Sequence, residues 1–138
     1  MTLPRRSRRP SSAPLQTFVV FRAAGRRFAL STGQVTAVAE VPPVNRLSAP
    51  GRPEVLGLVA HRGRALPLVD LGRCLDGPAA AAAGGTHCIV VEHGERRAAF
   101  PVADLEGLAR VPGGALPPGC ETFDPVQVVL AAGRERTR

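Results

Sequence analysis

Glycine and proline interrupt this chain so often that no apolar segment can extend into a long helix. Of its 138 residues, 15 are glycine and 14 are proline, and the apolar segments between them are short. Proline removes a backbone donor and disfavours helix interiors, while glycine weakens helices and strands alike. Short apolar segments separated by turn residues are typical of β-sandwiches and barrels. The sequence therefore predicts an all-β fold.

Three pairs of apolar segments predict β-hairpins. The paired segments are 18–21 with 27–30, 54–60 with 64–71, and 87–91 with 96–102. The turns between them contain Gly25, Gly63 and Gly94. Glycine accepts the positive φ that a tight hairpin turn requires. A bend and a further short strand are predicted over 104–111.

Other segments have patterns that fit less regular structure. Residues 32–41 fit both a helical and an extended spacing, and residues 42–53, with four prolines, predict an ordered extended loop. Asp70 is expected to cap a short turn or helix over 71–76. The alanine-rich segment 77–85 is too short to hold itself helical and predicts a loop between two halves of one domain, 17–130. The halves, about 17–76 and 86–130, are expected to form two small barrels that share a core.

The positive charge lies mostly at the two ends of the chain. The formal net charge is +7, yet residues 15–133 carry eleven arginines against ten acids. We therefore expect a disordered arm rich in arginine and proline over 1–16 and a basic tail over 131–138. These tails leave open an alternative function, a small β-barrel that binds nucleic acid through arginine-rich tails. The nearly neutral body and the absence of Trp and Tyr oppose that alternative.

The chain shows no motif for catalysis, for a cofactor or for a metal. Its cysteines, Cys74, Cys88 and Cys120, form no CxxC pair, and no P-loop, GxSxG or GxGxxG sequence occurs. We expect no enzymatic activity, no cofactor, no metal and no small-molecule substrate. The chain has neither an apolar run long enough to span a bilayer nor an export signal, so we expect a cytoplasmic protein.

Arg62 is the side chain that stands out. It lies in the predicted turn at 61–63, between two strongly predicted strands. One interpretation is a solvated turn arginine. The other is a planar guanidinium, held at a rigid hairpin tip, for a partner's carboxylate or a helix C-terminus. The pattern alone leaves both open.

Residues 57–76, GLVAHRGRALPLVDLGRCLD, resemble the CheW family of chemosensory coupling proteins. The family signature combines a glycine, an apolar pair, an Asn-x-Arg-Gly turn and a strand ending in Pro-apolar-apolar-Asp-Leu. Here these correspond to Gly57, Leu58-Val59, the turn at 60–63 and residues 67–71. The order of elements over 17–111 is also similar to that of the family, with Val35 and Val38 at matching apolar positions.

The resemblance implies two SH3-like barrels that share a core, and a non-enzymatic adaptor. In the family, the adaptor joins the cytoplasmic signalling tip of chemoreceptors to a CheA-type histidine kinase in chemoreceptor arrays. By matching position, the resemblance places five candidate residues in the receptor groove between the barrels: Val35, Ala37, Gly57, Arg62 and Leu108. For Gly57 it implies a backbone requirement rather than a direct contact.

This sequence departs from the family pattern in two places. Ala60 and His61 replace an asparagine and an apolar residue in the turn. After Val111 the family has a further hairpin and a final strand, whereas residues 112–138 hold a loop, the apolar segment FDPVQVVL and a basic tail. FDPVQVV, residues 123–129, is our candidate for that final strand, in a shortened second barrel with an exposed edge. The shortening is similar to that of the FrzB-type accessory protein of gliding bacteria, weakens the expected kinase contact and offers a route to self-association.

Overall fold

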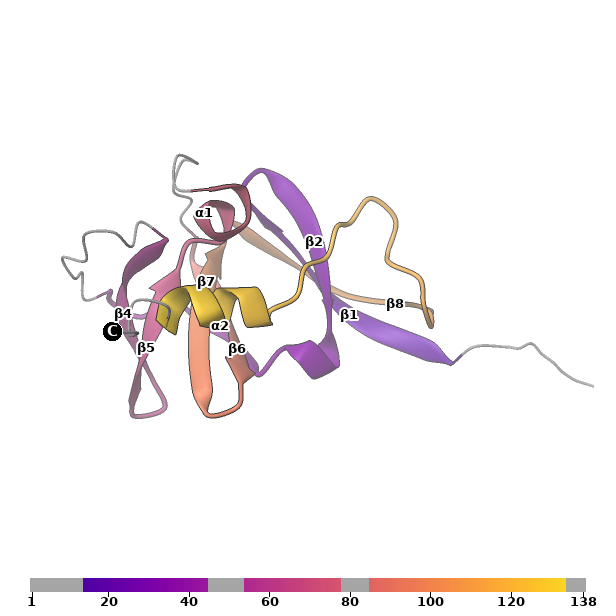
Figure 1. The fold of residues 1–138 in the computed structure, drawn as a ribbon. Helices are drawn as coiled ribbons and strands as arrows, with labels where there is room; N and C mark the ends of the chain where they lie inside the picture. The colour runs from indigo at the N-terminus through magenta and orange to yellow at the C-terminus, as the bar shows by residue number, and fades with distance from the viewer. Residues whose placement is uncertain (1–13, 45–53, 78–84, 134–138) are drawn as a thin grey trace, which may run out of the picture.

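The computed structural model describes residues 14–44, 54–77 and 85–133, which form two β-sheets, two α-helices and one 3-10 helix (Figure 1). The smaller sheet has the strand order β2 (Arg26–Ser31), β1 (Leu15–Ala23), β8 (Asp104–Pro112). The larger has the order β3 (Ala37–Glu40), β6 (His87–His93), β7 (Arg96–Val102), β5 (Arg64–Val69), β4 (Val55–His61). The helices are η2 (Thr32–Gln34), α1 (Leu71–Asp76) and α2 (Val126–Gly133). The predicted all-β class is confirmed.

The three predicted hairpins are β1–β2, β4–β5 and β6–β7, and each closes through a two-residue turn. Ala24 and Gly25 have φ of 56° and 74°, and Arg62 and Gly63 have φ of 52° and 77°. A positive φ at both central residues defines a type I′ turn, whose twist matches that of the flanking strands. Arg62 thus adopts a backbone conformation that few residues other than glycine tolerate.

The strands of each sheet come from both sides of the alanine-rich segment. β1 pairs with β8, β6 pairs with β3, and β5 lies parallel to β7 through Leu68 and Ala99. The observed sheets therefore differ from the expected grouping into 17–76 and 86–130. The reason is that each hairpin buries its apolar faces against strands from the other half of the chain.

The larger sheet is rolled on itself. Side chains from one face of all five strands meet in a single cluster made of Val59, Leu66, Leu68, Cys88, Val90 and Ala99, with Ala37 and Ala39 packed against it. β3 and β4 form the two edges of the sheet, yet both contribute to this cluster. A sheet whose opposite edges line one interior is curved in the manner of a small barrel.

A second cluster fills the space between the two sheets. It joins Phe21, Phe28 and Leu30 of the smaller sheet to Ile89 and Phe100 of the larger one, with Val128 and Val129 of α2. Four phenylalanines lie together here: the rings of Phe21 and Phe123 each contact the other and those of Phe28 and Phe100, with centroids 5.4–6.5 Å apart. This cluster is the core shared by the two sheets, as the family resemblance implies.

The remaining face of the smaller sheet is covered by a loop. Phe18, Val20 and Ala29 pack there against Cys120. The loop reaches the free side of β2, where the Ala29 N–H donates to the Glu121 carbonyl at 2.9 Å. In the described residues, this half of the fold thus has three strands and a covering loop.

The prediction of a final strand over FDPVQVV was wrong, because α2 begins at Val126. The Asp124 carboxylate accepts a hydrogen bond from the Val126 N–H at 3.0 Å, and Pro125 begins the first turn. An acidic cap followed by proline is a helix start signal. Since α2 continues to Gly133, the expected tail is helical at 131–133, and its remainder, 134–138, lies outside the described residues.

The shorter elements agree with the sequence expectations only in part. The Asp70 carboxylate caps α1 by accepting from the Arg73 N–H at 3.1 Å, as predicted. The ambiguous segment 32–41 combines a 3-10 turn with β3, and β8 is longer than the short strand expected. β1 begins at Leu15, inside the expected arm. Residues 1–13, 45–53 and 78–84, which hold most of the arm and the two expected loops, lie outside the described residues.

Candidate partner-binding surface

Three turns gather at one end of the larger sheet. β3 is antiparallel to β6, β6 is antiparallel to β7, and β7 is parallel to β5. β3 therefore runs parallel to β5 and begins at the end where the β4–β5 turn lies. This end, residues 34–37, 61–64 and 92–97, is called the hairpin end below. Figure 1 shows the tips of β4–β5 and β6–β7 side by side at the lower edge of the molecule.

Arg62 is exposed at the tip of the β4–β5 hairpin. In the described part of the chain its guanidinium has no hydrogen bond and no ion pair with another side chain. The type I′ turn fixes the backbone beneath it, because both φ angles are positive and the flanking strands are paired up to His61 and Arg64. The turn therefore presents a planar group with five donors to solvent on a rigid base.

An apolar hollow of about 400 Å³ lies along the same hairpin. Its walls are Pro43, Leu58, Val59, Ala60, Gly63, Arg64 and Ala65. Pro43 follows β3, whereas the other residues belong to β4, β5 and their turn, so the hollow lies between the two edges of the rolled sheet. A small apolar side chain fits such a site, with the guanidinium of Arg64 beside it.

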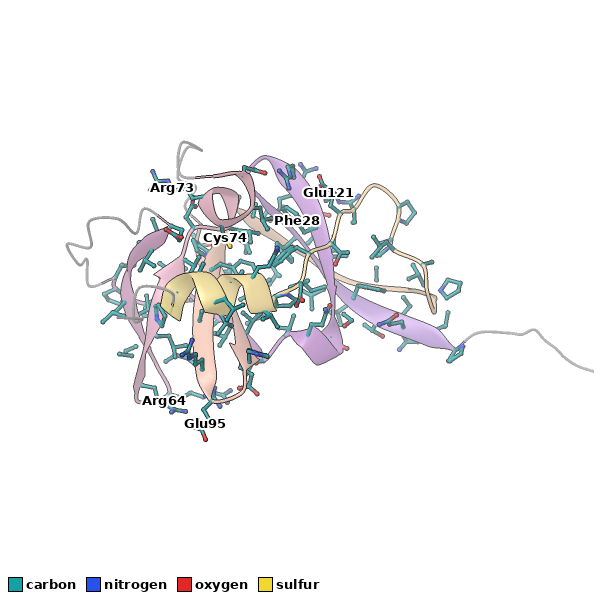
Figure 2. The ribbon with its side chains drawn as sticks, viewed as in Figure 1. Phe28, Arg64, Arg73, Cys74, Glu95 and Glu121 are labelled. Atoms are coloured by element: carbon teal, nitrogen blue, oxygen red, sulfur yellow. The ribbon has the colours of Figure 1, made fainter. Side chains whose placement is uncertain are left out.

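A second, polar hollow of about 360 Å³ separates the two hairpin tips. It is lined by Arg64, Glu92, Gly94, Glu95 and Arg97. Arg64 and Glu95 project from the two tips in Figure 2. The Arg97 Nε donates to the Glu92 Oε1 at 2.9 Å, so this pair is satisfied within its own hairpin.

The hairpin end is basic, with four arginines against two glutamates. The arginines at 64, 96 and 97 and the glutamates at 92 and 95 were not among the predicted site residues. The signal that could have found them is the charged sequence EHGERR around a predicted turn, which folds beside the turn that holds Arg62.

Two of the predicted site residues, Val35 and Ala37, lie at the hairpin end with Arg62. Val35 follows η2 and packs against the shared core. The next residue, Thr36, joins this segment to the larger sheet, because the Thr36 N–H donates to the Val90 carbonyl at 2.8 Å. Ala37 packs against the interior of the rolled sheet, and its neighbour Val38 is 40% exposed.

Leu108 and Gly57 lie apart from that group. Leu108 belongs to the smaller sheet, where it is opposite Val19 of β1, and it is 70% exposed. Gly57 is buried in β4 beside a register irregularity, and its φ is 156°. This φ, at a buried position, agrees with the expectation that glycine is needed at position 57 for its backbone conformation. The structure therefore brings together Val35, Ala37 and Arg62 only.

Several arginines elsewhere are occupied by carboxylates. Glu106 accepts from the Arg27 Nε at 2.8 Å and from the Arg22 Nε at 2.9 Å, which joins the β1–β2 hairpin to β8. These hydrogen bonds, first that from Arg27, hold the pKa of the Glu106 carboxyl below its usual value. The guanidiniums of Arg22 and Arg27 are therefore used within the fold, whereas the guanidinium of Arg62 is unpaired among the described residues.

Arg26 has a similar structural role directly after the turn of the β1–β2 hairpin. Its Nη1 donates to both carboxylate oxygens of Asp76, at 2.7 and 2.8 Å, and its guanidinium lies 5.2 Å from the ring centroid of Phe28. The Nε lies 3.3 Å from the Glu121 Oε2 but is not aligned for a hydrogen bond with it. The hydrogen bond to Asp76 raises the pKa of Arg26. Arg26 thus fixes the hairpin to α1.

Within 14–44, 54–77 and 85–133, no cluster of three His, Cys, Asp or Glu side chains is arranged to hold a metal ion. Cys88 is buried inside the rolled sheet, and burial raises the pKa of its thiol. Among the same residues, no helix has the length and apolar character needed to cross a membrane.

Comparison with known proteins agrees with this architecture. The family model described as the CheW-like domain matches residues 17–135. Among solved structures, the scaffolding protein TtCheW from Thermoanaerobacter tengcongensis is similar, with a TM-score of 0.62 and 19% identity over 88% of this chain and 79% of that one. At that identity, the likeness shows the fold alone. No curated protein matches.

The family match extends over both sheets, the shared core and α2. CheW-like domains are non-enzymatic scaffolds of chemotaxis signalling, and they interact in general with chemoreceptors and CheA kinases. With its two sheets arranged around one core, this chain belongs to the CheW-like domain family and is an adaptor in chemotaxis signal transduction.

Proposed function

We propose that this chain docks on the cytoplasmic signalling tip of a chemoreceptor through its hairpin end. The observation that carries the proposal is the exposed, unpaired guanidinium of Arg62 on a rigid turn, next to an apolar hollow of about 400 Å³. Val35 and Ala37, the other family-matched positions at this end, lie at the start of β3.

A receptor tip presents helices, and the hairpin end offers the two kinds of contact that a helix can use. The guanidinium fork binds a carboxylate with two parallel hydrogen bonds, or binds the free carbonyls at a helix C-terminus. Apolar side chains on the same helix face fill the hollow between Pro43 and Leu58. The basic character of this end favours an acidic helix face. Lysine cannot replace arginine fully here, because it lacks the planar fork.

Coupling to a CheA-type kinase forms the second part of the proposal. The resemblance assigns much of the kinase contact to the second barrel, and in this chain the described residues after Pro112 form a loop and α2 where the family has a further hairpin and a final strand. We therefore propose that the chain binds its receptor without needing the kinase, in the manner of a FrzB-type accessory protein, and tunes the coupling from within cytoplasmic receptor arrays. Co-purification with a receptor fragment should succeed equally well with and without kinase.

The proposal is tested by titrating a receptor signalling-tip fragment against the full chain and Arg62 variants. Hydrogen bonds to charged groups contribute about 1.5–3 kcal/mol each, so Arg62→Gln should weaken binding by roughly 10- to 150-fold. Arg62→Glu should abolish binding, and Arg62→Lys should restore part of it.

The matched control is Arg22→Gln, which removes an equal charge from the smaller sheet. Its side chain is 56% exposed, and Glu106 keeps its hydrogen bond from Arg27. This control should bind like the wild type. Absence of binding by the wild type, or equal binding by Arg62→Glu, would overturn the proposed docking site.

A further inference from the structure

His61 is a departure from the family pattern that the receptor site does not yet account for, because the family has an apolar residue at this position. It is the last residue of β4 and directly precedes Arg62. It is half-buried, and in the part of the chain that the structure describes its imidazole has no hydrogen bond and no ion pair. Histidine is the side chain that gains and loses its charge near neutral pH. A titratable group therefore lies next to the guanidinium of the proposed receptor site.

The strand register places Arg64 directly opposite His61, where the two residues close the turn of the hairpin. Directly opposite side chains lie on the same face of a sheet, with their Cβ atoms about 4.5–5.5 Å apart. Val59, two residues before His61, shares this face and belongs to the cluster inside the rolled sheet. The imidazole and the Arg64 guanidinium therefore lie together at the hairpin end, on the inner face of the rolled sheet. Figure 2 shows Arg64 at this tip.

Few other charged groups face His61 from the described residues. β4 is an edge of the larger sheet, and the only charged wall of the apolar hollow along it is Arg64. Residues 34–37, at the start of β3, carry no charge. β5 separates β4 from β7, so the other charged walls of the polar hollow lie beyond Arg64: Glu92, Glu95 and Arg97. Within its own hairpin, His61 is therefore flanked by positive charge, Arg62 and Arg64.

These two arginines make the charge of His61 depend on what is bound at the hairpin end. In the free protein an imidazolium beside the Arg64 guanidinium is disfavoured, because like charges directly opposite each other destabilise a sheet. A carboxylate bound by either arginine reverses this preference, since a nearby negative charge favours the charged form of histidine. Binding of an acidic helix face is therefore expected to be accompanied by proton uptake at His61.

We propose that His61 makes receptor docking stronger as the pH falls from about 8 to about 5.5. The inference rests on the proposed function, because it needs a receptor carboxylate at the hairpin end. A complex that holds more protons than its free components becomes tighter as the pH falls. The receptor carboxylates titrate near pH 4, below this range, and stay charged throughout it. The gain from one exposed ion pair is roughly two- to fivefold in affinity.

The test is isothermal titration calorimetry of a receptor signalling-tip fragment with the full chain at about pH 8 and about pH 5.5. The wild type should bind roughly two- to fivefold more tightly at the lower pH. At an intermediate pH its binding enthalpy should change with the ionisation enthalpy of the buffer, because the complex takes up protons from that buffer. His61→Gln should lose both the pH dependence and the proton uptake. His61→Arg, which is always charged, should bind at the higher pH as tightly as the wild type does at the lower one.

His87→Gln is the matched control. His87 is also half-buried, but it begins β6 opposite Val102, at the end of the strand away from the hairpin end. This variant should keep the pH dependence of the wild type. His93 lies in the hairpin end, but its neighbour Glu92 lines the polar hollow and successive side chains of a strand point to opposite faces. His93→Gln should therefore keep most of the pH dependence, whatever it does to the affinity itself.

Two results would overturn this inference and leave the receptor site standing. One is wild-type binding that depends on Arg62 but is independent of pH or weakens as the pH falls. The other is a His61→Gln variant that keeps the pH dependence, including the case in which His93→Gln loses it. A wild type that binds no receptor fragment at either pH would instead overturn the proposed function, and this inference with it. Circular dichroism at both pH values checks that each variant is folded.

Discussion

Gly57 has a backbone conformation that favours glycine, and it lies in β4, the strand that lines the apolar hollow and leads into the Arg62 turn. Substitution of Gly57 should therefore affect both stability and the proposed receptor surface. Gly57 is buried, follows a register irregularity after Val55 and has a φ of 156°. This region of backbone space is almost restricted to glycine, and other residues held in it are destabilised by about 1–3 kcal/mol. Gly57→Ala should therefore lower the free energy of unfolding by about that amount.

The corresponding shift in melting temperature follows from the chain length. For a domain of this size, 1 kcal/mol corresponds to roughly 3 °C, so Gly57→Ala should melt roughly 3–9 °C below the wild type. Gly57→Asp adds the burial of a carboxyl group, which costs at least about 1–3 kcal/mol more even when the group is neutral. That variant should melt lower still and should lose receptor binding, because β4 also forms the apolar hollow and the turn that holds Arg62.

Thermal unfolding followed by circular dichroism measures the effect, with Gly33→Ala as the matched control. A Cβ at Gly33 would meet no atom within 4 Å, and Gly33 does not have the positive φ of Gly57. The control should therefore melt within about 2 °C of the wild type. If Gly57→Ala melts like Gly33→Ala, the backbone argument is wrong. If it melts normally but fails to bind receptor, Gly57 is a direct contact instead.

Three further predictions concern single side chains. Glu106→Gln should destabilise the protein at neutral pH, and the difference in melting temperature from the wild type should shrink as the pH falls from about 6 to about 3. The reason is that the pKa of Glu106 is lowered in the folded state. The stabilisation by the Glu106 carboxylate is therefore fully present above the unfolded pKa of about 4.3 and is lost as the pH falls through the folded pKa. Asp70→Ala removes the cap of α1 and should cost about 1–2 kcal/mol in urea unfolding, with Asp70→Asn milder. In the native protein, a maleimide reagent should modify the partly exposed Cys74 and Cys120 before Cys88. Cys88 should react last because it is buried and burial raises the pKa of its thiol. Equal reaction rates for all three cysteines would contradict the burial of Cys88.

The hairpins were predictable because their signals are local. Gly25, Gly63 and Gly94 fall between apolar segments at the spacing of tight turns, and the structure places a two-residue turn at each. The cap at Asp70 is equally local, since the carboxylate bonds to a backbone group three residues away. Arg62 could be singled out for the same reason, because its position depends only on its own hairpin.

Long-range pairing and the last helix were not predictable in the same way. The pairing of β1 with β8 depends on which apolar faces meet in the shared core, and no local pattern in either strand specifies its partner. In FDPVQVVL, the β-branched valines favoured a strand, while the helix start signal in Asp124-Pro125 was missed. Tertiary packing of Val128 and Val129 into the shared core then decides in favour of the helix.

The docking of a receptor on the hairpin end is tested most directly by the footprint of that receptor on this chain. Hydrogen–deuterium exchange of the full chain, with and without a receptor signalling-tip fragment, reports which backbone amides the partner protects. We predict slower exchange at residues 34–37 and 61–64 and in the 92–97 turn, with exchange in β8 unchanged by the fragment. Protection confined to β8 or to the terminal arginine-rich segments, with the hairpin end unchanged, would contradict the proposed site.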